Sequence, residues 1–73
     1  MKDNLKLKKK LAYRRGRDAN RKGHMCAPVG DPIMEEIANS GLVSHSDMQN
    51  LYRKWIEGWT WANLHKEEPK VTV

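Results

Sequence analysis

The chain contains little of what an enclosed catalytic site or a secreted scaffold needs. It has one Cys, no Phe and no apolar run long enough for a signal peptide or a membrane span. The single Cys26 cannot close an intramolecular disulfide, so we expect a protein of a reducing cytoplasm without membrane contact. A chain of 73 residues forms one domain at most and buries only about 60 % of its unfolded surface. That leaves no room for an enclosed active site.

Motifs for catalysis and metal binding are also missing. There is no Gly-rich phosphate loop, no acid pair and no hydrolase elbow. No recognisable base and orienting carboxylate accompany Cys26 as a nucleophile. A zinc site needs four ligands that converge, and the candidates are scattered along the sequence: His24, Cys26, His45 and His65. The sequence therefore predicts a protein with no catalytic residue, no metal, no cofactor and no small-molecule substrate.

The charge is strongly polarised along the chain. Residues 1–24 hold ten Lys and Arg against two acids, a balance of +8, whereas the remaining residues sum to −3 and the whole chain to +5. A basic segment of this density attracts any anionic partner, whether RNA, DNA or an acidic protein surface, and cannot distinguish among them. A solvated, solubilising helix face is the alternative, although ten bases in 24 residues favour binding.

The amino-terminal third predicts a helix from about Leu5 to Lys22, capped by Asp3 or Asn4. Leu, Lys, Ala and Arg are good helix formers, and no Pro interrupts them. Very small residues recur on one side of this helix, where another helix could approach closely. The small stripe consists of Ala12, Gly16, Ala19 and Gly23.

A second, shorter helix follows a turn or tight loop over Met25 to Pro32, where two Pro and a Gly fall within eight residues. Asp31 and Pro32 form an N-cap and a first-turn proline, and Gly41 offers a C-cap. The apolar face of this helix is Ile33, Met34, Ile37 and Ala38.

The third predicted helix begins at Ser46, which lies three residues before Gln49 as in a capping box, with Asp47 in the first turn. Large apolar residues then recur with helical spacing. They are Met48, Leu51, Tyr52, Trp55, Trp59 and Ala62. After His65 the sequence KEEPKVTV has no periodicity and predicts a frayed tail.

The small and the large stripes complement each other, so we expect the first and third helices to pack together. Trp55 and Trp59 would nest against the small residues, and the short helix would close the open side through Ile33 and Ile37. The prediction is an all-α single domain over residues 1–73, with an ordered core from about 5 to 65 and a flexible tail from 66 to 73. On this packing, Gly16→Leu should unfold the domain.

Partner contacts are expected from exposed cations and aromatics. Arg14, Arg17 and Arg21 share one face, where they can address phosphates or carboxylates together. Trp61 lies about 200° around the helix from Trp59 and should point away from the core, although it could simply cover a loop or the tail. The predicted partner-binding residues are Tyr13, Arg14, Arg17, Arg21, Lys22 and Trp61.

Two blocks of the sequence resemble the ribosome modulation factor family. That family has an R-G-x-x-A-x-x-x-G run, a Cys-Pro turn and a W-x-x-G-W-x-x-A helix. The matching positions here are Arg15-Gly16, Ala19, Gly23, Cys26, Trp55, Gly58-Trp59 and Ala62. The turn departs from the pattern as Cys26-Ala27-Pro28, and the section from Val29 to Lys54 is longer than the family's linker. The resemblance implies two packed helices and a protein that binds the ribosome and its RNA.

The whole chain, including the opening MKDNLKLKKKLAYRRGRDANRKGHM, also resembles the small transcription regulators of lytic Xanthomonas phages. This resemblance implies a protein of the infected host's cytoplasm that binds bacterial RNA polymerase at the amino-terminal part of the β′ subunit. Such a protein inhibits initiation by displacing the sigma factor, and it promotes antitermination. A basic helix and an exposed Trp suit an acidic protein surface beside an RNA exit path, where nearby RNA could be contacted. We expect polymerase as the partner, with the ribosome as the alternative.

Overall fold

The computed structural model describes the backbone of residues 2–65 and the side chains of residues 5–65. The predicted all-α domain is confirmed: two long helices pack together and a short helix lies between them in sequence. In chain order the elements are α1 (Lys2–Arg21), the 3-10 turn η1 (Pro28–Gly30), α2 (Pro32–Asn39) and α3 (His45–Leu64). The predicted tail, residues 66–73, lies outside the described residues.

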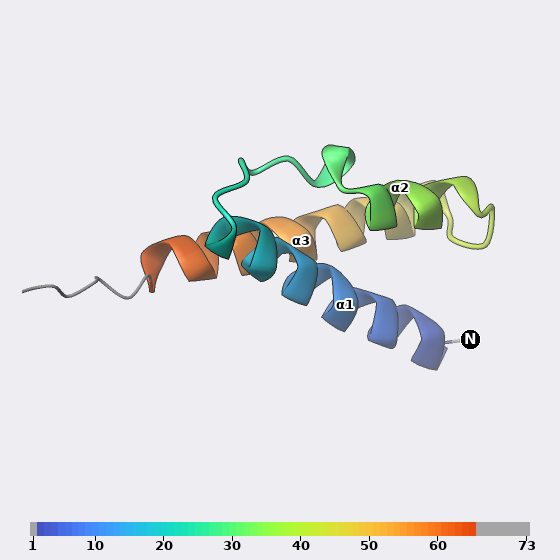
Figure 1. Cartoon of the computed structure of the whole chain (residues 1–73). Coiled ribbons are helices and arrows are strands. Elements are labelled where there is room, and N and C mark those ends of the chain that lie inside the picture. The colour runs from blue at the N-terminus through green and yellow to red at the C-terminus, as the bar shows by residue number, and fades with distance from the viewer. Residues whose placement is uncertain (1, 66–73) are drawn as a thin grey trace, which may run out of the picture.

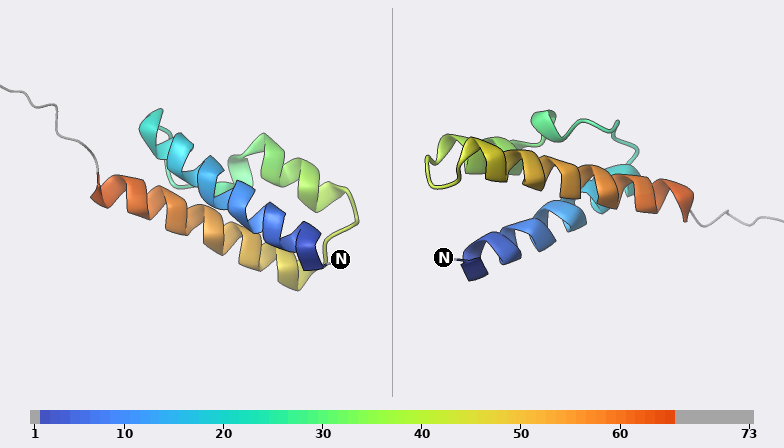
Figure 2. Two further views of the ribbon diagram at one scale, coloured as in Figure 1. Left: turned by 90° about the horizontal axis from the view of Figure 1, so that it is seen from below. Right: turned by 180° about the vertical axis from the view of Figure 1, so that it is seen from behind.

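The two long helices run in the same direction and cross (Figure 1). The connector carries the chain back along α3 through η1 and α2, so that α3 can start beside the amino-terminal half of α1. From the crossing, α1 diverges toward its amino terminus, as Figure 1 and the right-hand view of Figure 2 show. One long side of the first half of α1 is therefore not covered by another element.

Two glycines set the closest approach of α1 and α3. A Cβ added to Gly16 would collide with the carbonyl oxygen of Trp55, and one added to Gly58 would collide with the carbonyl oxygen of Tyr13. Each glycine thus lets its helix pack directly on the backbone of the other helix.

The small residues of α1 were predicted to receive indole rings. Ala12 and Ala19 do share the core cluster with Trp55. For Gly16 the prediction is wrong, because Gly16 lies against the backbone of Trp55 and Trp59.

The core lies between the three helices. Its fully buried side chains are Ala12, Met34, Leu51 and Trp55. Trp55 is therefore in the core as expected, whereas Trp59 is half-buried at the edge and donates its Nε1–H to the carbonyl oxygen of His24 at 3.0 Å. Ile33 and Ile37 of α2, which were predicted to close the open side of the helix pair, are partly buried and pack against this core. Met34 of the same helix is fully buried in it.

The ends of α1 differ from the prediction. The helix begins at Lys2, so Asp3 and Asn4 lie within it and do not cap it. At the other end Gly23 has a φ of +82° and faces open space, so it belongs to the helix stop and not to the packing stripe. Its N–H donates to the carbonyl oxygen of Asn20 at 3.0 Å, and the next N–H to that of Ala19 at 2.8 Å. These two bonds form a Schellman motif, which requires a left-handed residue here.

The cap of α3 is Ser44, not Ser46 as the capping-box pattern indicated. The Ser44 Oγ accepts the backbone N–H of Asp47 at 3.1 Å, and Ser46 lies inside the first turn. The prediction for α2 was closer, because Asp31 caps it and Pro32 follows at its first position. Its C-cap is Ser40, with Gly41 in the next position at a φ of +75°.

No helix within residues 2–65 is long and apolar enough to cross a membrane.

Candidate partner-binding surface

The side of α1 opposite α3 carries exposed cations. Arg14 and Arg21 are exposed there, two turns apart along the helix, because Ala12, Gly16 and Ala19 direct the opposite side into the core. The ion pairs among the side chains of residues 5–65 are Arg15–Asp31 and Lys54–Glu57. Neither arginine therefore has a carboxylate partner within this range, and both charges are available to another molecule.

Arg17 and Tyr13 lie at the border between this surface and the helix crossing. Both are half-buried, since the backbone of α1 at these two positions faces Gly58 of α3. The Nε of Arg17 is buried and has no hydrogen-bond partner in the described part of the chain. Arg17 is therefore less exposed than Arg14 and Arg21, because the close helix crossing covers its inner end.

Trp61 is exposed on α3, as its angle from Trp59 predicted. Its side chain is 41 % exposed and stacks on the ring of His65, with centroids 4.4 Å apart and planes 15° from parallel. It lies one turn beyond Gly58, the residue that faces Tyr13 and the Arg17 backbone. The stack fixes the indole while leaving part of it open, which is the arrangement of an anchor at an interface.

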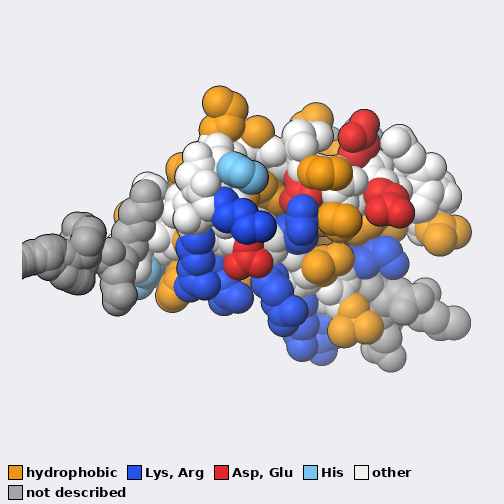
Figure 3. Space-filling view, viewed as in Figure 1, with side chains coloured by type: hydrophobic (Ala, Val, Ile, Leu, Met, Phe, Trp, Pro, Cys, Tyr) orange, Lys and Arg blue, Asp and Glu red, His pale blue; other side chains and the backbone are white. Residues whose placement is uncertain are grey.

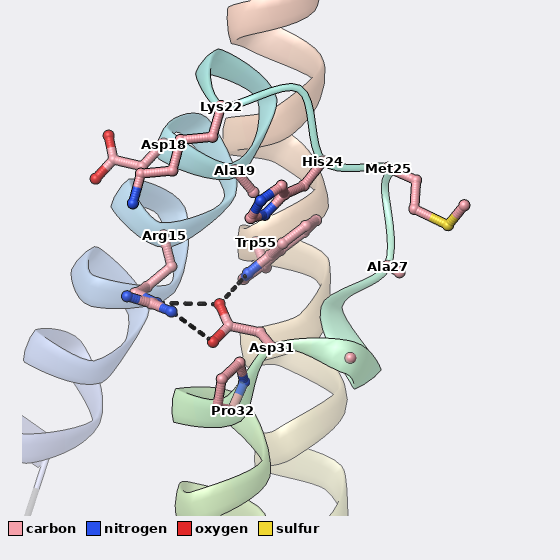
Figure 4. Close-up of a pocket in the computed structure, with 11 residues that line it drawn as sticks. Arg15, Asp18, Ala19, Lys22, His24, Met25, Ala27, Asp31, Pro32 and Trp55 are labelled. Atoms are coloured by element: carbon pink, nitrogen blue, oxygen red, sulfur yellow. Dashed lines mark hydrogen bonds and ion pairs between the residues drawn. The ribbon is translucent and has the colours of Figure 1, made fainter.

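Lys22 belongs to a different surface. It lines an open pocket of about 480 Å³, together with Asp18 of α1, His24 and Met25 of the connector, and Trp55 of α3 (Figure 4). The pocket opens on the side of α1 that faces η1 and α2. None of the other predicted contact residues lines this pocket, and Lys22 itself is exposed.

Asp31 forms hydrogen bonds to all three helices on this side of the molecule. Its two carboxylate oxygens accept four hydrogen bonds: from Arg15 Nε at 3.0 Å, Arg15 Nη2 at 2.8 Å, Trp55 Nε1 at 2.8 Å and the backbone N–H of Ile33 at 2.8 Å. The sequence predicted only the cap bond to the start of α2. The Asp31 network, which consists of Arg15, Asp31 and Trp55, joins α1, α2 and α3 at one carboxylate (Figure 4).

The electrostatics of this network keep Asp31 ionised. Burial opposes the charged form, but the hydrogen bonds from Arg15, Trp55 and the Ile33 N–H outweigh it and lower the pKa from 3.8 to about 2. The hydrogen bond to Asp31 also raises the pKa of Arg15. With both oxygens occupied and a low pKa, Asp31 is a poor general base, so the network acts as a structural support for the pocket wall.

The space-filling view shows how the charges are distributed over this face. Lys and Arg gather along α1 around one acidic side chain, and further acidic side chains stand at α2, which carries Glu35 and Glu36 (Figure 3). Among the described residues no group of three His, Cys, Asp or Glu side chains could hold a metal ion. What this surface offers chemically is hydrogen-bonding cations next to exposed apolar side chains.

Comparisons of the chain with protein-family models, with curated protein sequences and with solved structures gave no match.

Proposed function

We propose that this chain is a phage-encoded regulator that binds the host bacterial RNA polymerase at the amino-terminal part of its β′ subunit. Its action is stoichiometric and non-catalytic: bound to polymerase, it displaces the sigma factor to inhibit initiation and favours the antiterminating state during elongation. Such an effect needs only a difference in affinity between two states of the polymerase. The choice of polymerase rests on the resemblance of the sequence to small phage transcription regulators.

The observation that supports a macromolecular partner is the unpaired outer side of α1. Arg14 and Arg21 project from a rigid helix whose inner side is locked by Gly16 against α3. Because the helix is already formed, its backbone needs no ordering on binding, and arginine is enriched at protein interfaces. Trp61 adds a partly open indole on the neighbouring helix.

The test is a competition on purified bacterial RNA polymerase. The protein should bind the core enzyme and release labelled sigma factor from the holoenzyme. A double variant, Arg14→Glu with Arg21→Glu, should weaken this binding by about a hundredfold, because two favourable charge contacts become repulsive. Arg53→Glu, which changes an exposed arginine on α3, is the matched control and should change binding by about twofold or less. Full binding by the double variant, or absence of binding by the unaltered protein, refutes the proposal.

A second candidate is a ribosome-binding factor of the modulation type. It is favoured by the helix crossing, because Gly16, Ala19, Gly58 and Ala62, which belong to the resemblance pattern, are all buried. The salt dependence of binding distinguishes a ribosomal RNA partner from a polymerase partner. Binding to ribosomal RNA through many phosphates should weaken steeply as salt rises, whereas a protein interface with an apolar anchor should weaken less.

A further inference from the structure

Two leucines are exposed on α1 where a solvated helix would carry polar residues. The side chain of Leu7 is 61 % exposed and that of Leu11 is 38 % exposed, and neither belongs to the core cluster or to the residues packed against it. They lie one turn apart, so they form one short apolar strip, which we call the leucine strip. It lies on the half of α1 that diverges from α3 (Figures 1 and 2).

Cations border the leucine strip on both edges. Helical spacing places Lys10 and Arg14 along one edge and Lys8 along the other. None of these three has an acidic partner among the side chains of residues 5–65. Figure 3 shows hydrophobic side chains of α1 next to blue ones.

We propose that the leucine strip docks an acidic amphipathic helix of a protein partner, with apolar side chains four residues apart and carboxylates on both sides of them. The apolar side chains cover Leu7 and Leu11, and the carboxylates pair with Lys8, Lys10 and Arg14. This inference rests on the proposed function, in which polymerase supplies the segment, and it names the chemistry of that segment.

The strip favours this partner over the other anions that a basic helix attracts. RNA phosphates are bound by cations alone, and bases stack on aromatic or guanidinium planes and not on leucine. A helix that lies in a membrane surface needs a continuous apolar face along its length. In α1 the longer apolar face, which includes Leu5 and Ala12, is already used against the core. An apolar strip of one turn between cations matches one face of an acidic helix.

The test compares the full-length double variant Leu7→Gln with Leu11→Gln against Leu64→Gln. Gln keeps the helix propensity of Leu, and Leu64 is a matched control because it is 74 % exposed on α3. Circular dichroism melting checks that each variant is folded. The probes are purified RNA polymerase core, a synthetic helical peptide with paired Leu bordered by Glu, the same peptide with Lys for Glu, a short RNA and anionic phosphatidylglycerol vesicles.

The double variant should bind the acidic peptide and the polymerase about tenfold or more weakly, and Leu64→Gln should leave both within about twofold. The Lys peptide should not bind. Undiminished binding of the double variant to the acidic peptide overturns the inference, as does absence of peptide binding by the unaltered protein. It is also overturned if loss of the two leucines affects RNA or vesicle binding instead.

The polymerase proposal and the docking-site proposal can be refuted independently of each other. If the unaltered protein binds the acidic peptide in a leucine-dependent manner but does not bind polymerase, the docking site stands and the polymerase proposal falls. If polymerase binds but is indifferent to Leu7 and Leu11, the polymerase proposal stands and the docking site falls.

Discussion

Replacing Asp31 by Asn tests whether one carboxylate joins the three helices. The substitution preserves shape and one oxygen that can still cap α2, but its amide group would face the N–H donors of Arg15 and Trp55. The shift of the Asp31 pKa from 3.8 to about 2 corresponds to about 2 kcal/mol of stability at neutral pH. An unsatisfied buried Trp55 Nε1–H adds about 1 kcal/mol or more. We therefore expect Asp31→Asn to cost about 3 kcal/mol.

The pH dependence gives the sharper signature. The folded-state pKa of Asp31 is lower than the unfolded value, so its contribution is fully present above about pH 4 and is lost as the pH falls through about 2. The difference in unfolding free energy between the unaltered protein and Asp31→Asn should shrink by about 2 kcal/mol over that interval. Urea unfolding followed by tryptophan fluorescence at several pH values measures this difference.

Asp18→Asn is the control for this experiment. Asp18 lines the same pocket, but no ion pair of its carboxylate exists among the side chains of residues 5–65. It should change the unfolding free energy by less than about 0.5 kcal/mol. The reasoning is refuted if Asp31→Asn is as stable as the unaltered protein at pH 7, or if the difference between them stays constant from pH 4 to 2. A domain of this size has a total stability of only about 4 to 11 kcal/mol, so the expected loss is easily measured.

Further predictions concern the helix crossing and the helix ends. Gly16→Ala and Gly58→Ala should each cost about 3 kcal/mol or more, because the added methyl group meets backbone that cannot move aside; a melting temperature within a few degrees of the unaltered protein would contradict this. Ser44→Ala should cost about 1 kcal/mol and Ser46→Ala much less, and equal losses in urea unfolding would argue against the observed cap. Gly23→Ala should cost about 1 kcal/mol because of its positive φ alone, and a stabilised variant would count against the left-handed turn.

Local signals in the sequence predicted most of the fold. The Asp31-Pro32 start of α2 and the apolar spacing that buries Leu51 and Trp55 were identified correctly, because these features depend on neighbours within a few residues. Where several local signals competed, the prediction failed. Ser44 and Ser46 both lie near the start of this helix, and the pattern pointed to Ser46, whereas the Oγ of Ser44 accepts the N–H of Asp47 and caps the helix.

The candidate site was predicted less completely than the fold. Helical spacing alone located the outward Arg14 and Arg21 and the exposed Trp61. It could not show that Arg17 is partly covered or that Lys22 faces a pocket, because both facts depend on where other helices lie. The angular period of a helix predicts which of its residues share a face, but it does not predict which other helix or loop covers that face.

The sequence by itself determined that the chain forms three helices, that one long helix is basic on its exposed side, and that Gly16 permits a close approach. Only the tertiary structure decided what approaches it. Gly58 lies 42 residues away along the chain, and the carboxylate of Asp31 meets Trp55 across 24 residues. Such pairings form because packing buries backbone and carboxylate together, and a buried polar group must then find its partners wherever the fold brings them.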